Sequence, residues 1–421
     1  MARFVKEICV MKLRNQLLAL GCLAAFGLAG YFYVRMWVVQ KPQQIIVFVS
    51  DSMTSRHLGA ARLFANGADH RMAVEGLGHV ALMRNGSEDY AVPDTASATT
   101  ALATGVRVPH RCISATQTVQ PIPTILERAK QRGRSVGVVT NGTLAGSTLA
   151  PFYAHAALPD NTEHISKQLL ERGVVDVALG GGALDFTPEP EGRRKDGENL
   201  LAIYSDESRG EQALTVVRTK AELETLGRGS GRVLGVFSNG AMAFSNSIES
   251  GSDQPSLSDM TRRAIELLRS RNRSFMLVVD CSLFTSACEG NQTERALAEA
   301  LAFDAAVAEA REVAGEKALI VAVGRHSVGG LTLSGFPLRS MKTGDLLGPD
   351  SSGIPFISWA TGPAGPTTPA GGPRQNPTAY QTSYAIHNAE DMLVAGGGPG
   401  AERITGFMDC ARLFRVLLES L

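Results

Sequence analysis

Short, nearly uninterrupted apolar runs alternate with helical stretches along most of this chain. The runs are Gln44–Ser50, Ser135–Thr140, Val174–Leu179, Ser274–Asp280 and Lys317–Val323. A run of this length without polar alternation is typical of a strand buried on both faces. Helices are predicted over 121–133, 258–270 and 293–313, and a Gly/Pro/Thr-rich surface loop over 362–377. The order predicts an α/β fold, a mostly parallel central sheet with helices on both faces.

Two aspartates stand at the ends of predicted strands. Asp51 directly follows Gln44–Ser50, and Asp280 is the last residue of Ser274–Asp280. Because ligands of parallel sheets gather at the carboxyl ends of the strands, these two side chains mark a candidate binding edge.

Residues 93–107 form an unusual segment of small residues, Pro-Asp-Thr-Ala-Ser-Ala-Thr-Thr-Ala-Leu-Ala-Thr-Gly-Val-Arg. The segment predicts a tightly packed helix with Thr95 at its start. Free backbone N–H groups and the helix dipole favour an anion beside the Thr95 hydroxyl. The alternative is a capped packing helix with no chemical role.

This segment resembles the nucleophile block of the alkaline phosphatases, whose pattern is Asp-Ser-Ala-Ala-Ser-Ala-Thr-Ala followed shortly by Thr-Gly-Val-Lys. Other stretches resemble the same family in order and spacing: Pro121–Glu127, Val175–Gly182, Ala300–Val307, His326–Leu333 and Gly398–Glu402. The resemblance implies an alkaline-phosphatase-like domain that hydrolyses phosphate monoesters through a covalent phosphoryl-enzyme, with two zinc ions and a magnesium ion. It places Thr95 at the nucleophile position, where a threonine hydroxyl can perform the same displacement as serine.

The resemblance also implies metal-ligand positions in this sequence. Asp51 matches the aspartate that contacts one zinc and the magnesium, and His326 matches a ligand of the second zinc. Thr148 and Asp280 match magnesium ligands, with Asp280 one methylene shorter than the family's glutamate. The full set of candidate metal ligands is Asp51, Thr148, Asp280, Glu289, His326 and His387.

Five positions depart from the family pattern. Gly146 stands where an acidic or histidine side chain is usual, and Pro159 where the family keeps the arginine that clamps phosphate. Thr285 and Glu289 replace the aspartate and histidine that hold the first zinc, together with His387. Arg325 replaces an aspartate ligand of the second zinc. At an effective dielectric of ~20, a guanidinium ~4 Å from a dication costs on the order of 8 kcal/mol, so Arg325 must swing away or that metal is absent.

Two functional hypotheses follow from these matches and departures. The first is a pseudophosphatase, an impaired or inactive phosphate-monoester hydrolase that acts as a binding or scaffold protein. The second is an active phosphomonoesterase with an altered metal set, in which Thr95 is the nucleophile and Arg325 takes over the missing arginine's charge near phosphate. A sulfatase-like relative is a distant third, because the sulfatase Cys/Ser-x-Pro-x-Arg motif is absent. The family resemblance also implies a homodimer.

The N-terminus predicts a membrane segment. Residues 15–34 are uncharged and span about 30 Å as a helix, the thickness of a bilayer core. Basic residues precede them, which predicts a cytoplasmic N-terminus (1–14), a signal-anchor helix (15–34), a linker (35–43) and an exported domain (44–421). The alternatives are a signal peptide cleaved after Gly27-Leu-Ala29 and, less favoured, a buried helix.

Charge and cysteine content set the remaining bounds. Lys+Arg and Asp+Glu both total 41, and there is no basic run or RNA-binding motif, so the sequence does not indicate nucleic-acid binding. Four cysteines lie beyond the anchor, and they fit either disulfide pairing after export or single buried thiols: Cys112, Cys281, Cys288 and Cys410.

Overall fold

The computed structural model describes residues 2–34, 41–206, 208, 210, 213–227, 229–248, 252–339, 344–365 and 376–421. It divides into two compact units, Met1–Lys41 and Pro42–Leu421.

The first unit holds one long helix, α1 (Ala2–Tyr33). Its stretch Met11–Tyr33 is long and apolar enough to cross a membrane, although an N-terminal signal sequence passes the same test. The helix extends on the amino side of the predicted membrane segment 15–34, since residues 2–14 contain no glycine or proline that would end it. Most of the predicted linker, residues 35–40, lies outside the described residues.

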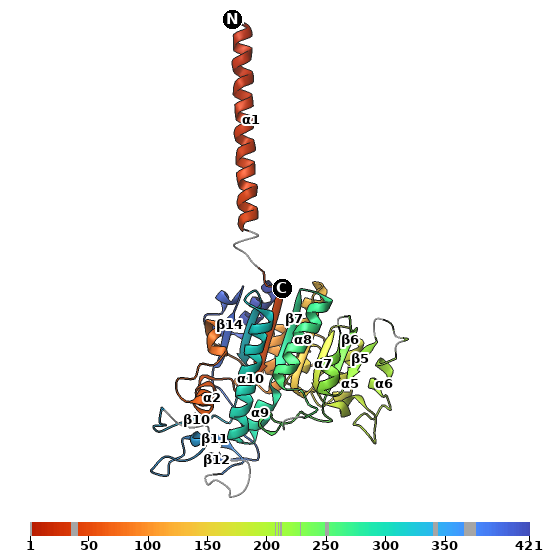
Figure 1. Cartoon of the computed structure of the whole chain (residues 1–421), viewed down its shortest axis with the longest axis vertical. Coiled ribbons are helices and arrows are strands. Elements are labelled where there is room, and N and C mark those ends of the chain that lie inside the picture. The colour runs from red at the N-terminus through yellow and green to blue at the C-terminus, as the bar shows by residue number, and fades with distance from the viewer. Residues whose placement is uncertain are drawn as a thin grey trace. The chain divides into compact units, whose positions relative to one another are not determined.

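The second unit is built around a ten-stranded sheet with the order β15-β2-β14-β8-β1-β7-β3-β4-β6-β5 (Figure 1). The strands are β1 (Gln44–Ser50), β2 (His79–Arg84), β3 (Ser135–Thr143), β4 (Val177–Gly181), β5 (Leu214–Val217), β6 (Arg232–Val236), β7 (Phe275–Asp280), β8 (Leu319–Gly324), β14 (Met392–Gly397) and β15 (Gly406–Asp409). Neighbouring strands of this sheet pair in parallel, except that β14 runs antiparallel to both β8 and β2. The predicted mostly parallel sheet is therefore confirmed.

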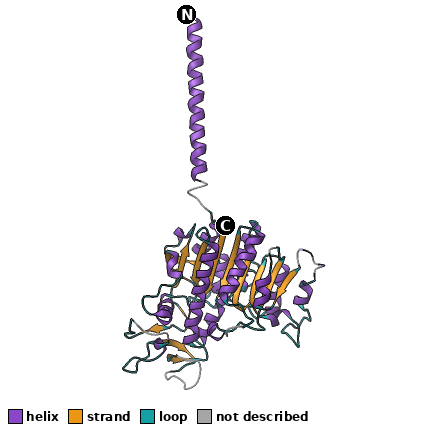
Figure 2. Cartoon of the chain, in the orientation of Figure 1, coloured by secondary structure: helices purple, strands orange, loops and turns teal. Residues whose placement is uncertain are grey.

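Helices cover both faces of the sheet (Figure 2). The side chains of β1 alternate between the two resulting cores. Ile45, Val47 and Val49 pack into the core that contains α3 (Thr95–Thr104), α4 (Ile125–Gln131), α5 (Thr162–Glu171), α6 (Leu200–Tyr204) and α11 (Cys410–Ser420). Ile46 and Phe48 pack into the core that contains α2 (Ser55–Asn66), α7 (Lys220–Thr225), α8 (Leu257–Arg271), α9 (Ser282–Glu289) and α10 (Thr293–Ala314). A strand buried on both faces has no polar alternation, which explains its apolar run.

Smaller elements complete the second unit. A three-stranded sheet consists of β10 (Thr332–Leu333), β11 (Ile357–Gly362) and β12 (Thr378–Gln381), and β9 (Ser327–Val328) pairs with β13 (His387–Asn388). The 3-10 helices are η2 (Val74–Leu77), η3 (Ala150–Phe152), η4 (Ala183–Phe186), η6 (Ser245–Ser247), η7 (Asp345–Leu347) and η8 (Ala401–Arg403). Within the predicted loop 362–377, residues 366–375 lie outside the described residues. Cys112, Cys281, Cys288 and Cys410 are single buried thiols.

Two predicted boundaries differ from the observed ones for local reasons. The helix expected from Pro121 begins at Ile125, because Thr124 caps it: Glu127 N donates to Thr124 Oγ1 (3.2 Å) and Glu127 Oε2 accepts from Thr124 N (2.8 Å). Strand β4 begins at Val177 rather than Val174, because the Asp176 side chain accepts hydrogen bonds from neighbouring segments instead.

The register of the central strands gathers their carboxyl ends at one edge of the sheet. Val49 of β1 lies opposite Asp280 of β7, and Ser50 lies opposite Gly324 of β8. The residues that follow β1 and β8, together with the last residue of β7, are therefore brought together.

Candidate functional site

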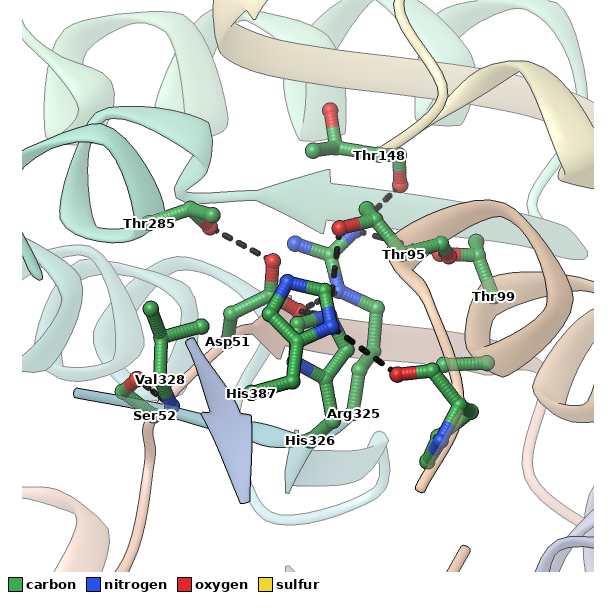
Figure 3. Close-up of polar contacts among 12 residues, drawn as sticks. Asp51, Ser52, Thr95, Thr99, Thr148, Thr285, Arg325, His326, Val328 and His387 are labelled. Carbon is green, nitrogen blue, oxygen red and sulfur yellow. Dashed lines mark hydrogen bonds and ion pairs between the residues drawn. The ribbon is translucent and has the colours of Figure 1, made fainter. Parts of the chain in front are cut away.

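At this edge a buried arginine, Arg325, lies between two buried aspartates, Asp51 and Asp280. Figure 3 shows Arg325 beside Asp51. Arg325 Nε donates to Asp51 Oδ1 at 2.7 Å, and Arg325 Nη2 lies 3.0 Å from Asp280 Oδ1 without the alignment of a hydrogen bond. All three side chains are 0% exposed. Of the two predicted alternatives, Arg325 swinging away or the metal being absent, the first is not what the structure has: the guanidinium stays inside and pairs with both carboxylates.

Other polar atoms of Arg325, Asp51 and Asp280 form hydrogen bonds within the protein. Arg325 Nη1 donates to the carbonyl oxygen of Thr148 and, at 3.4 Å, to Thr99 Oγ1. On the carboxylates, Thr285 Oγ1 donates to Asp51 Oδ2 (2.7 Å) and Thr140 Oγ1 to Asp280 Oδ2 (2.8 Å). Hydrogen-bonded oppositely charged groups are the form in which charges tolerate burial.

Burial and the neighbouring charges shift the pKa values of Asp51, Asp280 and Arg325. Burial raises the pKa of Asp51, but the charge of Arg325, followed by that of His326, outweighs burial and holds the pKa below its usual value. For Asp280 burial dominates, and its pKa is raised despite Arg325. Burial lowers the pKa of Arg325, but the charges of Asp51 and Asp280 raise it by more. The net shift of the pKa is upward, so the guanidinium remains charged.

The Thr95 hydroxyl lies at the start of α3, beside His326. Asp94 caps this helix by accepting from Ser97 N at 2.9 Å, which fixes Thr95 as its first residue. Thr95 Oγ1 lies 3.1 Å from His326 Nε2. The His326 ring stacks on that of His387 with 4.1 Å between centroids, and His387 Nδ1 lies 2.9 Å from the carbonyl oxygen of Pro93.

His326 Nε2 is shared between Thr95 and Asp51. Burial, the largest cause, lowers the pKa of His326 to about 4, so the ring is neutral at pH 7. Asp51 Oδ1 lies 3.3 Å from Nε2, and an ionised carboxylate only accepts hydrogen bonds, which favours a proton on Nε2. With that proton in place, Nε2 cannot accept a proton from Thr95.

Two other predicted metal ligands, Thr148 and Glu289, also lie at this edge. The Thr148 hydroxyl donates to Ser282 Oγ at 3.3 Å, while its carbonyl accepts from Arg325. Glu289 lies close enough to Asp51 and His387 to feel their charges: burial and then Asp51 raise its pKa, and His387 opposes them. The structure thus gathers the predicted site residues at one edge without testing their roles.

The residues at this edge do not fit the zinc and magnesium set implied by the resemblance. In the described ranges, no group of three or more His, Cys, Asp or Glu side chains is arranged to hold a metal ion. The position between Asp51 and His326, which the second zinc would take, borders the Arg325 guanidinium. A bound dication there would be repelled by a fixed positive charge.

Two features of the site were not predicted from the sequence. Arg111 adopts a left-handed backbone (φ 67°), its N donates to Asp94 Oδ2 at 2.8 Å, and its guanidinium pairs with Asp160, beside Pro159. The backbone of Arg111 thus contacts the residue that caps α3, whereas its guanidinium is paired with Asp160. At Gly146 a Cβ atom would lie 2.9 Å from Thr143 Oγ1, so the turn has closed over the position of the missing side chain.

Comparisons of sequence identify the family. Residues 42–345 match the family model for alkaline phosphatase. Alkaline phosphatase 4 of Bacillus subtilis is 30% identical over 304 residues, which are 69% of this chain and 62% of that protein, so the chain spans less than two thirds of it. The tissue-nonspecific alkaline phosphatase of Gallus gallus is 27% identical over 428 residues, which cover 86% of this chain and 81% of that protein.

Comparisons of structure agree with the sequence match. The alkaline phosphatase of the Antarctic bacterium TAB5 superposes with a TM-score of 0.71 at 22% identity, covering 91% of this chain and 98% of that one. That of Thermus thermophilus gives a TM-score of 0.73 at 24% identity, covering 91% and 92%. At these identities the superpositions establish the fold, and together with the family match they show that this chain belongs to the alkaline phosphatase family.

Proposed function

We propose that this protein is a membrane-anchored pseudophosphatase, an alkaline-phosphatase-like domain with impaired or no phosphomonoesterase activity that acts as a binding or scaffold protein. The observation that carries the proposal is the Arg325 guanidinium between Asp51 and Asp280. It supplies one fixed positive charge where the family resemblance implies zinc and magnesium. Lewis-acid activation of a phosphoryl group requires such metal ions, and an arginine cannot replace the open coordination position of a metal.

The same contacts argue against Arg325 as a phosphate clamp. A clamp needs guanidinium N–H groups that point at the substrate. In Arg325, Nε and Nη1 already donate to Asp51, Thr148 and Thr99, and Nη2 faces Asp280. Binding a phosphate through Arg325 would first require breaking a fully buried ion pair.

An active phosphomonoesterase with an altered metal set remains the second candidate. It is favoured by the Thr95 hydroxyl, which lies at a helix start and 3.1 Å from His326 Nε2. The structure of a His-to-Glu variant of the TAB5 alkaline phosphatase contains bound magnesium, so a substituted alkaline phosphatase can hold a metal. In this candidate Asp51 and His326 would hold a metal ion that supplies Lewis-acid activation of the phosphoryl group, and Thr95 would be the nucleophile.

Metal content and turnover separate the two candidates. We expect the purified full chain, incubated with zinc and magnesium and then dialysed, to hold far less than one zinc per molecule and to hydrolyse an aryl phosphate no faster than its Thr95→Val variant. Turnover that is lost in Thr95→Val, with zinc near stoichiometry, would establish the enzyme and refute the pseudophosphatase.

We also propose that α1 anchors the chain and that the domain is exported. The support is its apolar stretch Met11–Tyr33 and the basic residues ahead of it. A reporter fused after Leu421 should lie outside the cytoplasm and sediment with membranes. A soluble mature protein that begins near Gly30 would instead show a cleaved signal peptide. Homodimer formation stays a prediction from the family.

A further inference from the structure

The chain enters the domain at the edge of the sheet opposite the candidate site. Strand β1 begins at Gln44, and its parallel neighbours β7 and β8 begin at Phe275 and Leu319 in the same register. Ten residue steps separate Val34, directly after α1, from Gln44. Fully extended, they span at most about 35 Å. If α1 spans the bilayer, this amino edge is the part of the sheet tethered close to the lipid surface.

The loops that lead into the central strands at this edge are basic. Residues 41–43, 132–134, 271–274 and 315–318 precede β1, β3, β7 and β8, and they carry six basic side chains against one acidic. Three of the six are engaged: Arg132 and Arg134 with the C-terminal segment (its end is marked in Figure 1), and Arg271 with Asp176.

The other three basic side chains at the amino edge are Lys41, Arg273 and Lys317. All three are exposed, and among the described residues no hydrogen bond or ion pair engages their side chains. Glu316 is the acidic residue of these loops. Unpaired exposed cations within a Debye length of a charged surface contribute to attraction, whereas paired ones are largely neutralised.

Two cavities are lined by residues of this edge. One, of about 700 Å³, has Gln43, Gln44, Arg269 and Arg273 in its lining together with the carboxylate of Glu266. The other, of about 350 Å³, has Gln43, Gln44, Arg269 and Lys317 together with Glu316. Arg269 lies in both linings, and its buried Nε has no hydrogen-bond partner. Its terminal nitrogen donates to Gln44 Oε1 at 3.0 Å and to the carbonyl of Val313 at 2.8 Å. Cationic and amide groups around a hollow of this size suit a phosphodiester headgroup.

We propose that the amino edge of the sheet, with Arg273 and Lys317 lining these cavities and Lys41 in the segment that leads into β1, binds the headgroups of anionic phospholipids in the leaflet that the domain faces. The proposal rests on the anchoring proposed above, since the tether keeps this edge near the bilayer. It orients the domain with its amino edge on the membrane and the carboxyl edge, with Asp51 and Thr95, away from it. The candidate site is then open to molecules outside the membrane.

The test separates lipid binding from anchoring. A recognition sequence for a site-specific protease is inserted between Gln40 and Lys41 of the full chain, which is reconstituted in vesicles of phosphatidylcholine alone or mixed with phosphatidylglycerol. After cleavage, vesicle flotation measures how much of the released domain stays bound. We expect retention on the anionic vesicles alone, and release at high ionic strength.

Two variants that each remove three positive charges test which edge of the domain binds the vesicles. The triple variant Lys41→Gln/Arg273→Gln/Lys317→Gln should lower the vesicle partition coefficient on the order of 100-fold, since each basic residue near an anionic surface contributes about a fivefold factor. The control is Arg84→Gln/Arg107→Gln/Lys195→Gln, which removes three exposed cations elsewhere. Arg84 ends β2, at the carboxyl edge. The control should keep most of the retention, and equal melting temperatures show that both variants are folded.

Equal release from neutral and anionic vesicles would overturn the proposal, and so would an equal loss in both triple variants. A mature protein shortened near Gly30 in cells would refute the anchor alone, because the vesicle assay measures a domain already detached from α1.

Discussion

The buried position of Arg325 leads to a quantitative prediction for zinc binding. Replacing Arg325 with Asp removes the positive charge that borders Asp51 and supplies a carboxylate at the position where the family resemblance implies one. We expect Arg325→Asp to bind zinc far more tightly than the wild type. The zinc would lie between Asp51 Oδ1 and His326 Nε2, two atoms that are 3.3 Å apart in the structure.

The size of the effect follows from one contact. A zinc ion about 2.1 Å from Asp51 Oδ1 lies at most about 4.8 Å from Arg325 Nε, because Nε is 2.7 Å from the same oxygen. At an effective dielectric of ~20 the repulsion is about 7 kcal/mol, or roughly five orders of magnitude in the dissociation constant. Even at the dielectric of bulk water it is about 1.7 kcal/mol, roughly 20-fold. We therefore expect tightening of at least about 20-fold.

Competition with a chromogenic chelator measures the zinc dissociation constant, and thermal unfolding with and without zinc gives an independent readout. Without metal, Arg325→Asp places a third carboxylate beside Asp51 and Asp280, so the variant should unfold at a lower temperature than the wild type. Zinc should restore most of that loss, because a ligand that binds the folded state alone stabilises it. The wild type should show little shift with zinc.

Arg325→Gln is the matched control, since it removes the repulsive charge without adding a ligand. Its zinc affinity should lie between those of the wild type and Arg325→Asp. The reasoning fails if wild-type protein already holds zinc tightly at this edge, or if Arg325→Asp changes the dissociation constant less than 20-fold while remaining folded. In the first case the guanidinium moves aside at little cost, and in the second the site lacks more than a ligand and a favourable charge.

Three further predictions concern catalysis and acid stability. Any phosphatase turnover gained by Arg325→Asp should disappear when Thr95→Val is added, as measured with an aryl phosphate. Burial raises the pKa of Glu127, but the hydrogen bond with His155 and other contacts outweigh burial and lower the pKa to about 2. The ionised Glu127 side chain therefore stabilises the folded state above pH ~4.5, and this stabilisation is lost as the pH falls through 2. Glu127→Gln should cost on the order of 3 kcal/mol at pH 7 and almost nothing near pH 2, by urea unfolding. For His57, burial lowers the pKa to about 3, so the unfolded chain takes up a proton below pH ~6.5 before the folded one does, and stability falls between pH 6.5 and 3. His57→Phe should remove about 5 kcal/mol of that decline, which the difference between unfolding at pH 7 and pH 3 measures.

The central sheet could be predicted because its physical signals are local. A strand buried on both faces must be apolar throughout, and Gln44–Ser50 was delimited to the residue on that basis. The same rule placed the start of β4 at Val174, three residues before the observed start at Val177. The apolar pattern does not show that the side chain of Asp176 accepts hydrogen bonds from Lys130 and Val136. Element type was set by the pattern, and boundaries by side-chain caps that the pattern does not contain.

The convergence of the site could also be predicted, but not its internal contacts. Because parallel strands end at one edge, Asp51 and Asp280 had to lie near each other. The position of Arg325 depends on which cation neutralises them. Treated only as a neighbour of a metal, an arginine is expected to turn away. Treated as the cation available to two buried carboxylates, it is expected to turn in, and this is what it does.

The same charge argument connects Arg325 with the other departures. Without metal ions, every carboxylate retained at this edge would be a buried charge that lacks a counterion, at a cost of several kcal/mol each. Relative to the implied family pattern, Thr285 has lost a carboxylate, and its hydroxyl instead donates to Asp51 Oδ2 at 2.7 Å. Gly146 presents no side chain, in a turn with no room for one. Thr285 and Gly146 each lower the negative charge of the edge, Thr285 adds a donor to a remaining carboxylate, and Arg325 supplies the cation. Glu289 instead adds a carboxylate in place of a histidine and Pro159 removes a cation, so these two departures do not follow the charge argument. The substitutions at Gly146, Thr285 and Arg325 are thus more readily understood as parts of one ion-pair network than as separate losses of ligands, and for that reason restoring a single ligand should increase zinc affinity before it restores turnover.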